Sequence, residues 1–511
     1  MAEPNPAPGA RVSAGDAGAK TTPESGRPIF SGLPAPVRQR AALVLPSTAE
    51  FDSRAYRIAS ALVARGHDVV VLARWRPGLP EDEQHPAGYR IRRVKVSAGS
   101  GLPLPDPVLR TAGSWRRRRR DRSAAASLGA ANSPVAAPSP AVATRPAATS
   151  PPAAASPLVA ATALAPSGSP AHRRPAPLSR LTRLPGAFRR VAAIALVVRS
   201  QVKASRRLGE HADLYHGMAY MGIPVALDLA GRFGGRAVYD ARDIYMDAGN
   251  LARLPRPARS VVGRLERGWA RRAARVITVN RPYAEVMAQR FGVELPLVVL
   301  NCSYRFDPPA PPRRRFHEAL GLAADIRVVL YQGGFARDRG IEQLIAAIPS
   351  IDGAVLVLLG YGPLLAELVA RAADPALGGR LRVLPAVPPG ELLGWVAAAD
   401  VVAMPIQPTT LNHRLTTPNK LFEAMAAGVP VVASDLPGMA GIVRESGCGL
   451  LVDPTDPAAI AGAIRAILDA PEVERRAFGE RALAAAHATY NWERQMERLL
   501  AEYGRLTGAP W

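Results

Sequence analysis

Short apolar runs alternate with helical patterns along two stretches of the chain. The first stretch opens with an apolar run at 41–45, an amphipathic helical pattern at 53–65 that ends at Gly66, and a second run at 68–73. This β–α–β order predicts a parallel sheet whose functional edge lies at the carboxyl ends of its strands. Further strands are predicted near 89–96, 214–216, 237–239, 276–279 and 297–300, with a helix at 259–274.

The second stretch repeats this alternation after a Pro- and Arg-rich boundary that starts at Asn301. Short strands separated by helices indicate a Rossmann-like domain. The chain is therefore predicted to be an α/β protein of two Rossmann-like domains, 37–300 and 301–490, which face a central cleft. A last helix in the segment 491–511 could cross back to the first domain. The strands of the second domain are predicted near 328–331, 354–359, 381–384, 401–404, 429–433 and 449–452.

Two segments lack the alternation. Residues 1–36 are rich in Pro, Gly and Ala and are predicted to be a disordered tail. Residues 110–207 contain 18 Lys and Arg against one acid, Asp121, and so carry +17 of the net charge of +23. Within them, 123–171 is a low-complexity run of Ala, Pro and Ser, which buries too little apolar surface to offset its ordering entropy. We expect a basic, Ala- and Pro-rich insertion in the first domain.

An amphipathic helix is predicted at 178–209, at the end of this insertion. Such a helix can lie on an anionic membrane surface, or it can pack on its own domain with a solvated basic face. The run of five arginines at 116–120 favours the membrane. Nucleic-acid binding is disfavoured, because Trp115 and Phe188 are the only aromatic residues interleaved with these arginines. The apolar positions of the helix are Leu181, Leu184, Phe188, Val191, Ile194 and Val198.

The two cysteines, Cys302 and Cys448, exclude a disulfide-rich secreted domain and a multi-cysteine zinc site, and we expect both as buried thiols. The N-terminus lacks the apolar core of a signal peptide. The apolar run at 191–198 is far shorter than the roughly 20 residues that cross a bilayer. A cytoplasmic protein is predicted, held at the inner face of the cell membrane by the basic helix.

The stretch LNHRLTTPNKLFEAMAAGVPVVASD, at 411–435, has the signals of a short helix followed by a buried strand. Thr417 is predicted as the N-cap, the next proline as the first helical residue, and Gly428 as the stop. Lys420 stands in a first turn that lacks acids, and a basic helix start with free N–H groups suits a phosphate. Glu423 follows one turn later, where it could accept hydrogen bonds from ribose hydroxyls. The alternative is a capped surface helix with a solvated lysine and glutamate.

A second basic helix start follows the first strand of the second domain, which ends in Gly333 and Gly334. Glycines let the backbone approach a ligand closely, and Arg337 and Arg339 can pair with an anion at the helix start. This loop and the turn of Lys420 belong to the carboxyl ends of strands in one parallel sheet, where open α/β sheets bind ligands. Two basic helix starts at one crevice predict a diphosphate site.

Taken in order, the motifs of the chain resemble the retaining, GT-B-fold, nucleotide-sugar glycosyltransferases of family 4, also called group 1. The PNKLFE form of the last motif is that of the bacterial surface-polysaccharide branch. The resemblance covers nearly the whole chain outside the tail and 110–207. It rests on the segments 53–73, 212–217, 238–245, 272–280 and 298–303 of the first domain and on 328–345, 358–363 and 411–435 of the second.

The resemblance implies that Gly333 and Gly334 face the donor diphosphate and that Arg339 and Lys420 pair with its oxygens. These two cations would act as electrostatic catalysts, because neutralising the diphosphate makes it a leaving group. The chain contains no Asp-x-Asp pair, which is consistent with cationic side chains in place of a metal. We therefore expect no metal and no cofactor besides the nucleoside diphosphate sugar, which is the donor substrate.

The resemblance also implies which residues contact the ribose and the sugar of the donor. Glu423 matches the terminal glutamate that holds the ribose, and Thr417 and Asn419 would line the sugar-phosphate end. His216 is the candidate for the histidine near the reacting sugar, with a satisfied structural histidine as the alternative. Arg337 is the candidate for the first basic residue of the glycine loop.

The chain departs from the family pattern at three positions. Leu415 stands where the pattern has its first glutamate. The His-x-His pattern reads His216-Gly217-Met218, so the second histidine is missing. Gly334 occupies the place of the basic residue in the glycine loop.

The leading hypothesis is an enzyme that moves a sugar, with retention, from a nucleoside diphosphate to an acceptor hydroxyl. The acceptor would be a lipid-linked or growing cell-surface glycan. One alternative is a nucleotide-sugar epimerase of the same fold, which needs no acceptor. Another is a non-catalytic, membrane-associated scaffold, which the missing glutamate and histidine favour.

Overall fold

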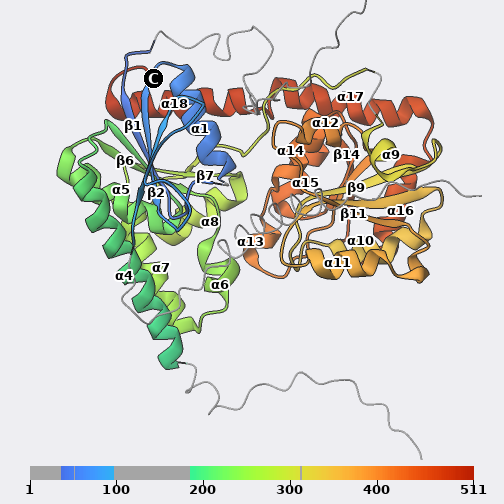
Figure 1. Cartoon of the computed structure of the whole chain (residues 1–511), viewed down its shortest axis with the longest axis horizontal. Coiled ribbons are helices and arrows are strands. Elements are labelled where there is room, and N and C mark those ends of the chain that lie inside the picture. Colours follow the sequence, from blue (N-terminus) through green and yellow to red (C-terminus); the bar gives the residue numbers. More distant parts are fainter. Residues whose placement is uncertain (1–35, 51, 97–183, 311–313) are drawn as a thin grey trace, which may run out of the picture. The chain divides into compact units, whose positions relative to one another are not determined.

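The computed structural model describes residues 36–50, 52–96, 184–310 and 314–511. The predicted tail, and the basic insertion apart from its final helix, lie outside these residues. The described part contains two domains, each a largely parallel sheet with helices on both faces (Figure 1). This is the two-domain α/β architecture that the hydrophobic pattern predicts.

The N-terminal domain has a sheet in the order β3-β4-β2-β1-β5-β6-β7-β8. Strand β3 pairs antiparallel with β4, and the other strand pairs are parallel. The charged β3 has no apolar run, which is why the sequence pattern did not predict it. The strands are β1 (Arg40–Val44), β2 (Asp68–Arg74), β3 (Asp82–Gln84), β4 (Arg90–Val94), β5 (Leu214–Met218), β6 (Arg236–Ala241), β7 (Arg275–Thr278) and β8 (Leu297–Val298).

Alternate residues of each strand in this sheet pack against different helices, as a twofold pleat requires. Ala41 and Leu43 of β1 belong to the core beneath α1, whereas Ala42 and Val44 belong to the core beneath α5 and α8. The helices of the domain are α1 (Ser53–Ala64), α4 (Leu184–Leu208), α5 (Ala219–Phe233), η1 (Tyr245–Asp247), α6 (Gly249–Ala252), α7 (Arg256–Arg272) and α8 (Arg281–Phe291).

The C-terminal domain has a parallel sheet in the order β11-β10-β9-β12-β13-β14. The chain winds from β9 to β11 on one side of β9 and from β12 to β14 on the other. The strands are β9 (Arg327–Gly334), β10 (Ala354–Tyr361), β11 (Leu381–Pro385), β12 (Val401–Met404), β13 (Val431–Ser434) and β14 (Gly449–Val452).

Helices cover both faces of this second sheet, with α10 and α11 on one face and α12 and α14 on the other (Figure 1). As in the first domain, alternate residues of a strand face opposite sides of the sheet. Val328 and Leu330 of β9 belong to the core beneath α12 and α14, and Val329 and Tyr331 belong to the core beneath α10 and α11. The helices are α9 (Arg315–Leu320), α10 (Ile341–Ala347), η2 (Ile348–Ser350), α11 (Leu365–Ala372), η3 (Pro375–Leu377), α12 (Leu392–Val396), α13 (Leu411–Arg414), α14 (Asn419–Ala426), α15 (Pro437–Ser446), α16 (Pro457–Leu468) and α17 (Glu472–Ala488).

The last helix, α18 (Trp492–Thr507), packs into the core of the N-terminal domain although it follows the C-terminal one. Trp492, Leu499 and Tyr503 are fully buried with residues of β1 and α1, and Trp511 closes the same cluster. The chain therefore ends inside the core of the domain in which its described part begins.

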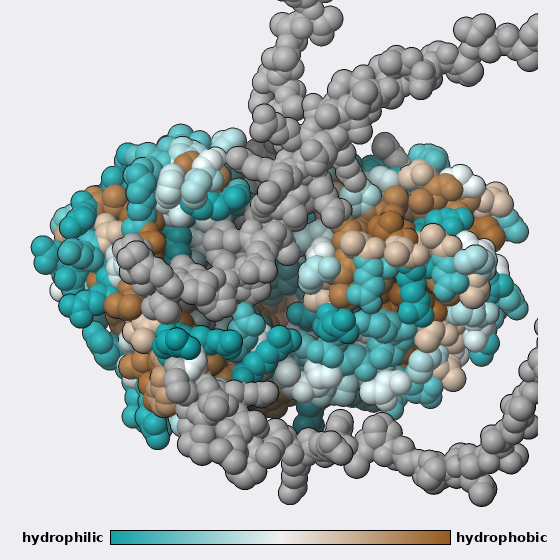
Figure 2. Space-filling model, turned by 60° about the horizontal axis from the view of Figure 1, so that its bottom comes forward, coloured by the Kyte–Doolittle hydropathy of each residue, from teal (hydrophilic) through white to brown (hydrophobic). Residues whose placement is uncertain are grey.

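Helix α4 packs on its own domain and still presents a basic, partly apolar face. Val197 and Val198 are buried, and Gln201 Nε2 donates a hydrogen bond of 2.8 Å to the carbonyl of Leu45. On the opposite side Phe188 and Leu196 are 47% and 46% exposed. Figure 2 shows one face of the whole molecule, on which hydrophobic residues (brown) lie among hydrophilic ones (teal). Within the described residues, no helix has the length and apolarity that a membrane span requires.

Both cysteines are free and buried, as predicted: Cys302 follows the first domain and Cys448 precedes β14. Burial raises the pKa of each thiol, so neither is poised as a nucleophile.

Candidate functional site

The site begins at the carboxyl ends of β9 and β12, which are neighbours in the second sheet. The winding direction of the chain reverses between these two strands, and open α/β sheets bind their ligands at such a switch point. Strand β9 ends in Gly333 and Gly334, the loop after it runs from Phe335 to Gly340, and the loop after β12 leads to α14. The two loops touch at Gly340, where a Cβ would lie 2.0 Å from the carbonyl oxygen of Pro405.

Gly333 brings the backbone at the end of β9 close to Lys420 at the start of α14. Its φ of +113° is a conformation that L side chains rarely adopt, so glycine is required there. A Cβ at this residue would lie 3.9 Å from Nζ of Lys420. Gly334 is exposed, and no other heavy atom lies within 4 Å of the place of its Cβ. The two glycines thus leave open space beside a lysine.

Lys420 is a buried cation. Its side chain is 8% exposed, and Nζ lies 3.5 Å from the centroid of the Tyr331 ring. The pKa of Lys420 is lowered to about 7, chiefly by burial and secondarily by the positive charge of Arg339, whereas Glu423 opposes both. Such an ammonium group is stabilised by any anion that enters the site.

Arg339 lies close enough to shift the pKa of several groups around the site. Burial lowers the pKa of Lys420 and of His413, and the charge of Arg339 lowers both further; at Tyr331 the same charge opposes the rise in pKa that burial causes. In the part of the chain that the structure describes, the Arg339 guanidinium makes no hydrogen bond or ion pair. Arg337, two residues earlier, is exposed, and within the described ranges its side chain makes no hydrogen bond or ion pair.

Glu423 lies one turn after Lys420 on α14 and is held by a glutamine. Gln332 Nε2 donates a hydrogen bond of 3.3 Å to Glu423 Oε2 and one of 3.5 Å to the carbonyl of Lys420. Burial raises the pKa of Glu423, and Lys420 and Arg57 oppose this. Gln332 is 1% exposed in an otherwise apolar strand. A polar residue in a buried run was the signal by which sequence reasoning could have found it.

The start of α14 differs from the prediction. The N-cap is Pro418 and the helix begins at Asn419, so Thr417 does not cap it. The hydroxyl of Thr417 donates instead to the carbonyl of Gly438 and accepts from Asn280 Nδ2 at 3.0 Å. Both partners are distant in sequence, and their hydrogen bonds to the Thr417 hydroxyl replace the capping hydrogen bond that the local sequence predicts. The predicted stop is confirmed, since Gly428 follows the helix with φ +67°.

Asn419 is exposed at the first position of α14, and its Oδ1 accepts a hydrogen bond of 2.7 Å from Asn301 Nδ2. Thr417 is 7% exposed one residue before the cap. Both residues lie at the helix start near Lys420. Among the described residues Nδ2 of Asn419 makes no hydrogen bond, so it can donate to a ligand, whereas the hydroxyl of Thr417 already serves two protein partners.

His216 lies apart from this group, in the core of the N-terminal domain. Its ring is fully buried, with Nδ1 against the Tyr503 hydroxyl and Nε2 3.0 Å from Asp240 Oδ2. Asp240 in turn forms a buried ion pair of 2.6 Å with Arg54. Because both ring nitrogens have protein partners, His216 does not reach a substrate in this structure. These contacts are those expected of a satisfied structural histidine, the alternative that the sequence left open for this residue.

No group of three or more His, Cys, Asp or Glu side chains that could hold a metal ion is found among the described residues. The charges that the site offers to an anion are those of Lys420 and Arg339.

Residues 326–470 match the family model described as Glycosyl transferases group 1. The D-inositol 3-phosphate glycosyltransferase of Xylanimonas cellulosilytica is 30% identical over 271 residues, which cover 50% of this chain and 62% of that protein. In this and seven similarly named relatives, the match spans 42–62% of the relative's own length. The chain thus spans about half the length of the curated relatives it matches.

Solved structures share the whole architecture. The sucrose-phosphate synthase of Thermosynechococcus elongatus superposes with a TM-score of 0.61 at 21% identity, covering 92% of this chain and 100% of that one. Anabaena Alr3699/HepE in complex with UDP and glucose gives 0.56 at 16% identity, with the same coverage of 92% and 100%. At these identities the likeness shows the fold alone. The chain therefore has the GT-B fold, and its residues 326–470 match the group 1 glycosyltransferases.

Proposed function

We propose that the protein is a glycosyltransferase of the retaining, family 4 type, which moves a sugar from a nucleoside diphosphate to an acceptor hydroxyl without a metal ion. The observation that carries the proposal is the pair of cations, Lys420 and Arg339, beside the open turn of Gly333 at the switch point of the sheet. A buried lysine beside a second cation is unfavourable in isolation. A diphosphate bound over Gly333 would offset the repulsion between the two cations and the cost of burying the lysine charge.

Catalysis would follow from the same electrostatics. As the bond between sugar and diphosphate breaks, negative charge grows on the leaving oxygens, and cations already in place stabilise that charge without reorganisation. The stabilisation is greater in the transition state than in the ground state, so it raises turnover. Glu423, fixed by Gln332, would accept hydrogen bonds from the ribose and so position the donor.

The names of similar proteins support the same reading. The Xylanimonas relative is named as a glycosyltransferase that acts on a sugar-like phosphate, D-inositol 3-phosphate. The Anabaena structure holds UDP and glucose in the same fold. A nucleoside diphosphate sugar is therefore the donor that we propose for this chain. Its acceptor we propose to be a lipid-linked or cell-surface glycan, as in the synthesis of surface polysaccharide or glycolipid.

Helix α4 would bring the enzyme to that acceptor at the cytoplasmic face of the cell membrane. Its exposed side combines Phe188 and Leu196 with the exposed cations Arg189, Arg199 and Lys203. Apolar side chains that enter the headgroup region and cations that attract anionic lipids together support peripheral binding. Packing of the opposite side on the domain would hold this face in place.

A panel of nucleoside diphosphates (UDP, GDP, ADP and dTDP) and their sugars tests the proposal. We expect one nucleotide to raise the melting temperature of the full chain and its sugar to be consumed when a lipid extract is added. Lys420→Met should remove the turnover, whereas Arg476→Met, at an exposed position of α17, should not. A chain that none of the nucleotides stabilises would refute the proposal.

The alternatives give other outcomes in the same experiment. A nucleotide-sugar epimerase would convert the donor without any acceptor. A non-catalytic scaffold would bind the nucleotide, or the membrane, and release no product. The anomeric configuration of the product, read by NMR, decides between retention and inversion.

A further inference from the structure

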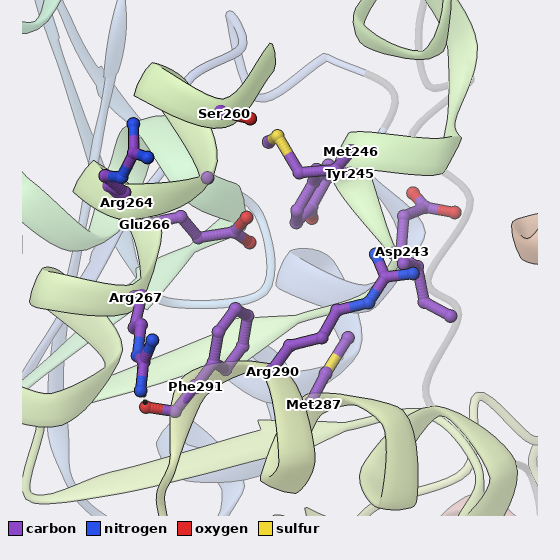
Figure 3. A pocket seen from close by; sticks show the side chains of 12 residues that line it. Asp243, Tyr245, Met246, Ser260, Arg264, Glu266, Arg267, Met287, Arg290 and Phe291 are labelled. Carbon is purple, nitrogen blue, oxygen red and sulfur yellow. Dashed lines mark hydrogen bonds between the residues drawn. The ribbon is translucent and has the colours of Figure 1, made fainter. Parts of the chain in front are cut away.

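A cavity of about 270 Å³ lies within the N-terminal domain, apart from the cations of the donor site. It is open to solvent on one side and lies between the loop after β6 with η1, α7 and α8 (Figure 3). Its walls are largely apolar and are formed by Tyr245, Met246, Met287 and Phe291. The volume is just below the range of roughly 300–1,000 Å³ that small-molecule sites occupy, so a ligand of about the size of one sugar ring fits.

Three arginines line this cavity. Arg264 and Arg267 come from α7, and Arg290 comes from α8 (Figure 3). Arg290 is already paired with Asp247 at 2.6 Å, and Arg267 donates through Nε to the carbonyl of Phe291 at 3.3 Å. Arg264 is exposed, and within the described ranges its guanidinium makes no hydrogen bond or ion pair. The cavity thus has a free guanidinium fork, which matches a phosphate or carboxylate.

Glu266 supplies a second polar group, on the inner side of the cavity. It is 3% exposed, and one of its oxygens accepts a hydrogen bond of 2.6 Å from the Tyr239 hydroxyl. No hydrogen bond to the other oxygen is found among the described residues, and Figure 3 shows the carboxyl group pointing into the cavity toward Tyr245. Burial raises the pKa of Glu266 to about 7. A buried carboxyl group with one free oxygen is satisfied by a hydroxyl donor from a ligand.

The wall of the cavity is held in place from outside. Asn412 Oδ1 accepts a hydrogen bond of 2.8 Å from the backbone N–H of Ile244, and its Nδ2 donates one of 3.1 Å to Asp243 Oδ1. Tyr283 donates to the same side chain at 2.8 Å. Because these contacts fix the loop after β6, the cavity is formed before a ligand arrives, and binding does not have to order it.

We infer that this cavity is a second small-molecule site, which binds a hydroxylated ligand that carries an anionic group. Arg264 holds the phosphate or carboxylate at the mouth, and Glu266 receives a hydroxyl inside. The apolar walls pack against the faces of a ring. The site does not depend on the donor chemistry proposed above.

Calorimetric titration of the full chain with glucose 6-phosphate tests this site. The titration uses Lys420→Met protein, so that the donor site does not take up the phosphate. Saturable binding is expected. Arg264→Gln should weaken it about tenfold, the loss that corresponds to one charge-assisted hydrogen bond. Arg256→Gln, on an exposed part of α7 outside the cavity, is the matched control and should leave the affinity unchanged.

The two recognition elements can be separated. Glu266→Gln keeps the acceptor for Tyr239, so the fold is retained, which an unchanged circular dichroism spectrum verifies. It should weaken glucose 6-phosphate about threefold or more and leave inorganic phosphate unaffected, because inorganic phosphate contains no sugar hydroxyl. Absence of saturable binding overturns the inference, and so does an equal loss of affinity in the Arg264→Gln and Arg256→Gln proteins.

Discussion

Binding of a nucleoside diphosphate should make the protein take up a proton, and Lys420 is the group that takes it up. In the free protein, burial lowers the pKa of Lys420 to about 7. A diphosphate beside the ammonium group restores the pKa toward its usual value of roughly 10.4. The difference corresponds to roughly 4–5 kcal/mol of interaction between lysine and ligand, at about 1.4 kcal/mol per pKa unit.

The number of protons follows from these two values. With a pKa near 7, Lys420 is about half protonated at pH 7 and only ~10% protonated at pH 8. In the complex it is almost fully protonated at both. Binding should therefore take up ~0.5 proton at pH 7 and ~0.9 proton at pH 8. The increase with pH is the signature of a lysine, because groups that titrate below pH 7 contribute less at pH 8.

Calorimetry measures this uptake directly. The nucleotide identified by the panel is titrated in Tris and in HEPES, and the difference in observed enthalpy gives the number of protons exchanged with the buffer. Lys420→Met should abolish the uptake, and Lys420→Arg should also abolish it while it retains the charge. An uptake that is equal in the parent and in Lys420→Met would refute the reasoning, since the proton would then belong to another group.

The remaining predictions concern the ribose contact, the buried carboxyl group and the membrane face. Glu423→Ala should weaken nucleotide binding about tenfold by calorimetry, the loss of hydrogen bonds to a charged acceptor; an unchanged affinity would remove its ribose role. Glu266 has its pKa raised from 4.5 to about 7, so the unfolded chain ionises first and stability falls between these pH values by roughly 3 kcal/mol and stays low above them. Urea titrations of Glu266→Gln should lack that fall, and a parallel pH dependence in both proteins would contradict it. Phe188→Asp with Leu196→Asp should reduce retention on anionic vesicles at low salt several-fold, while the melting temperature should change little because both side chains are exposed. Equal retention of parent and variant would exclude this face of α4.

Local pattern determined most of the elements of this protein, with the charged β3 and the first residue of α14 as exceptions. The predicted strands 401–404 and 449–452 coincide with β12 and β14, and the apolar positions of α14 are buried as its helical spacing requires. Two features of the site were also visible in the sequence: the glycine turn at Gly333 and a lysine at the start of α14. These signals are local, because backbone conformation and helical periodicity depend on neighbours a few residues away.

Tertiary structure decided which polar groups are free. His216 is engaged by Tyr503 and Asp240, and Thr417 by Asn280 and Gly438, through contacts between residues far apart in the chain. The sequence shows that such side chains are present, but their hydrogen bonds depend on which strands and helices meet. The cavity beside Glu266 likewise exists only where α7, α8 and the loop after β6 come together, so no single segment could have revealed it.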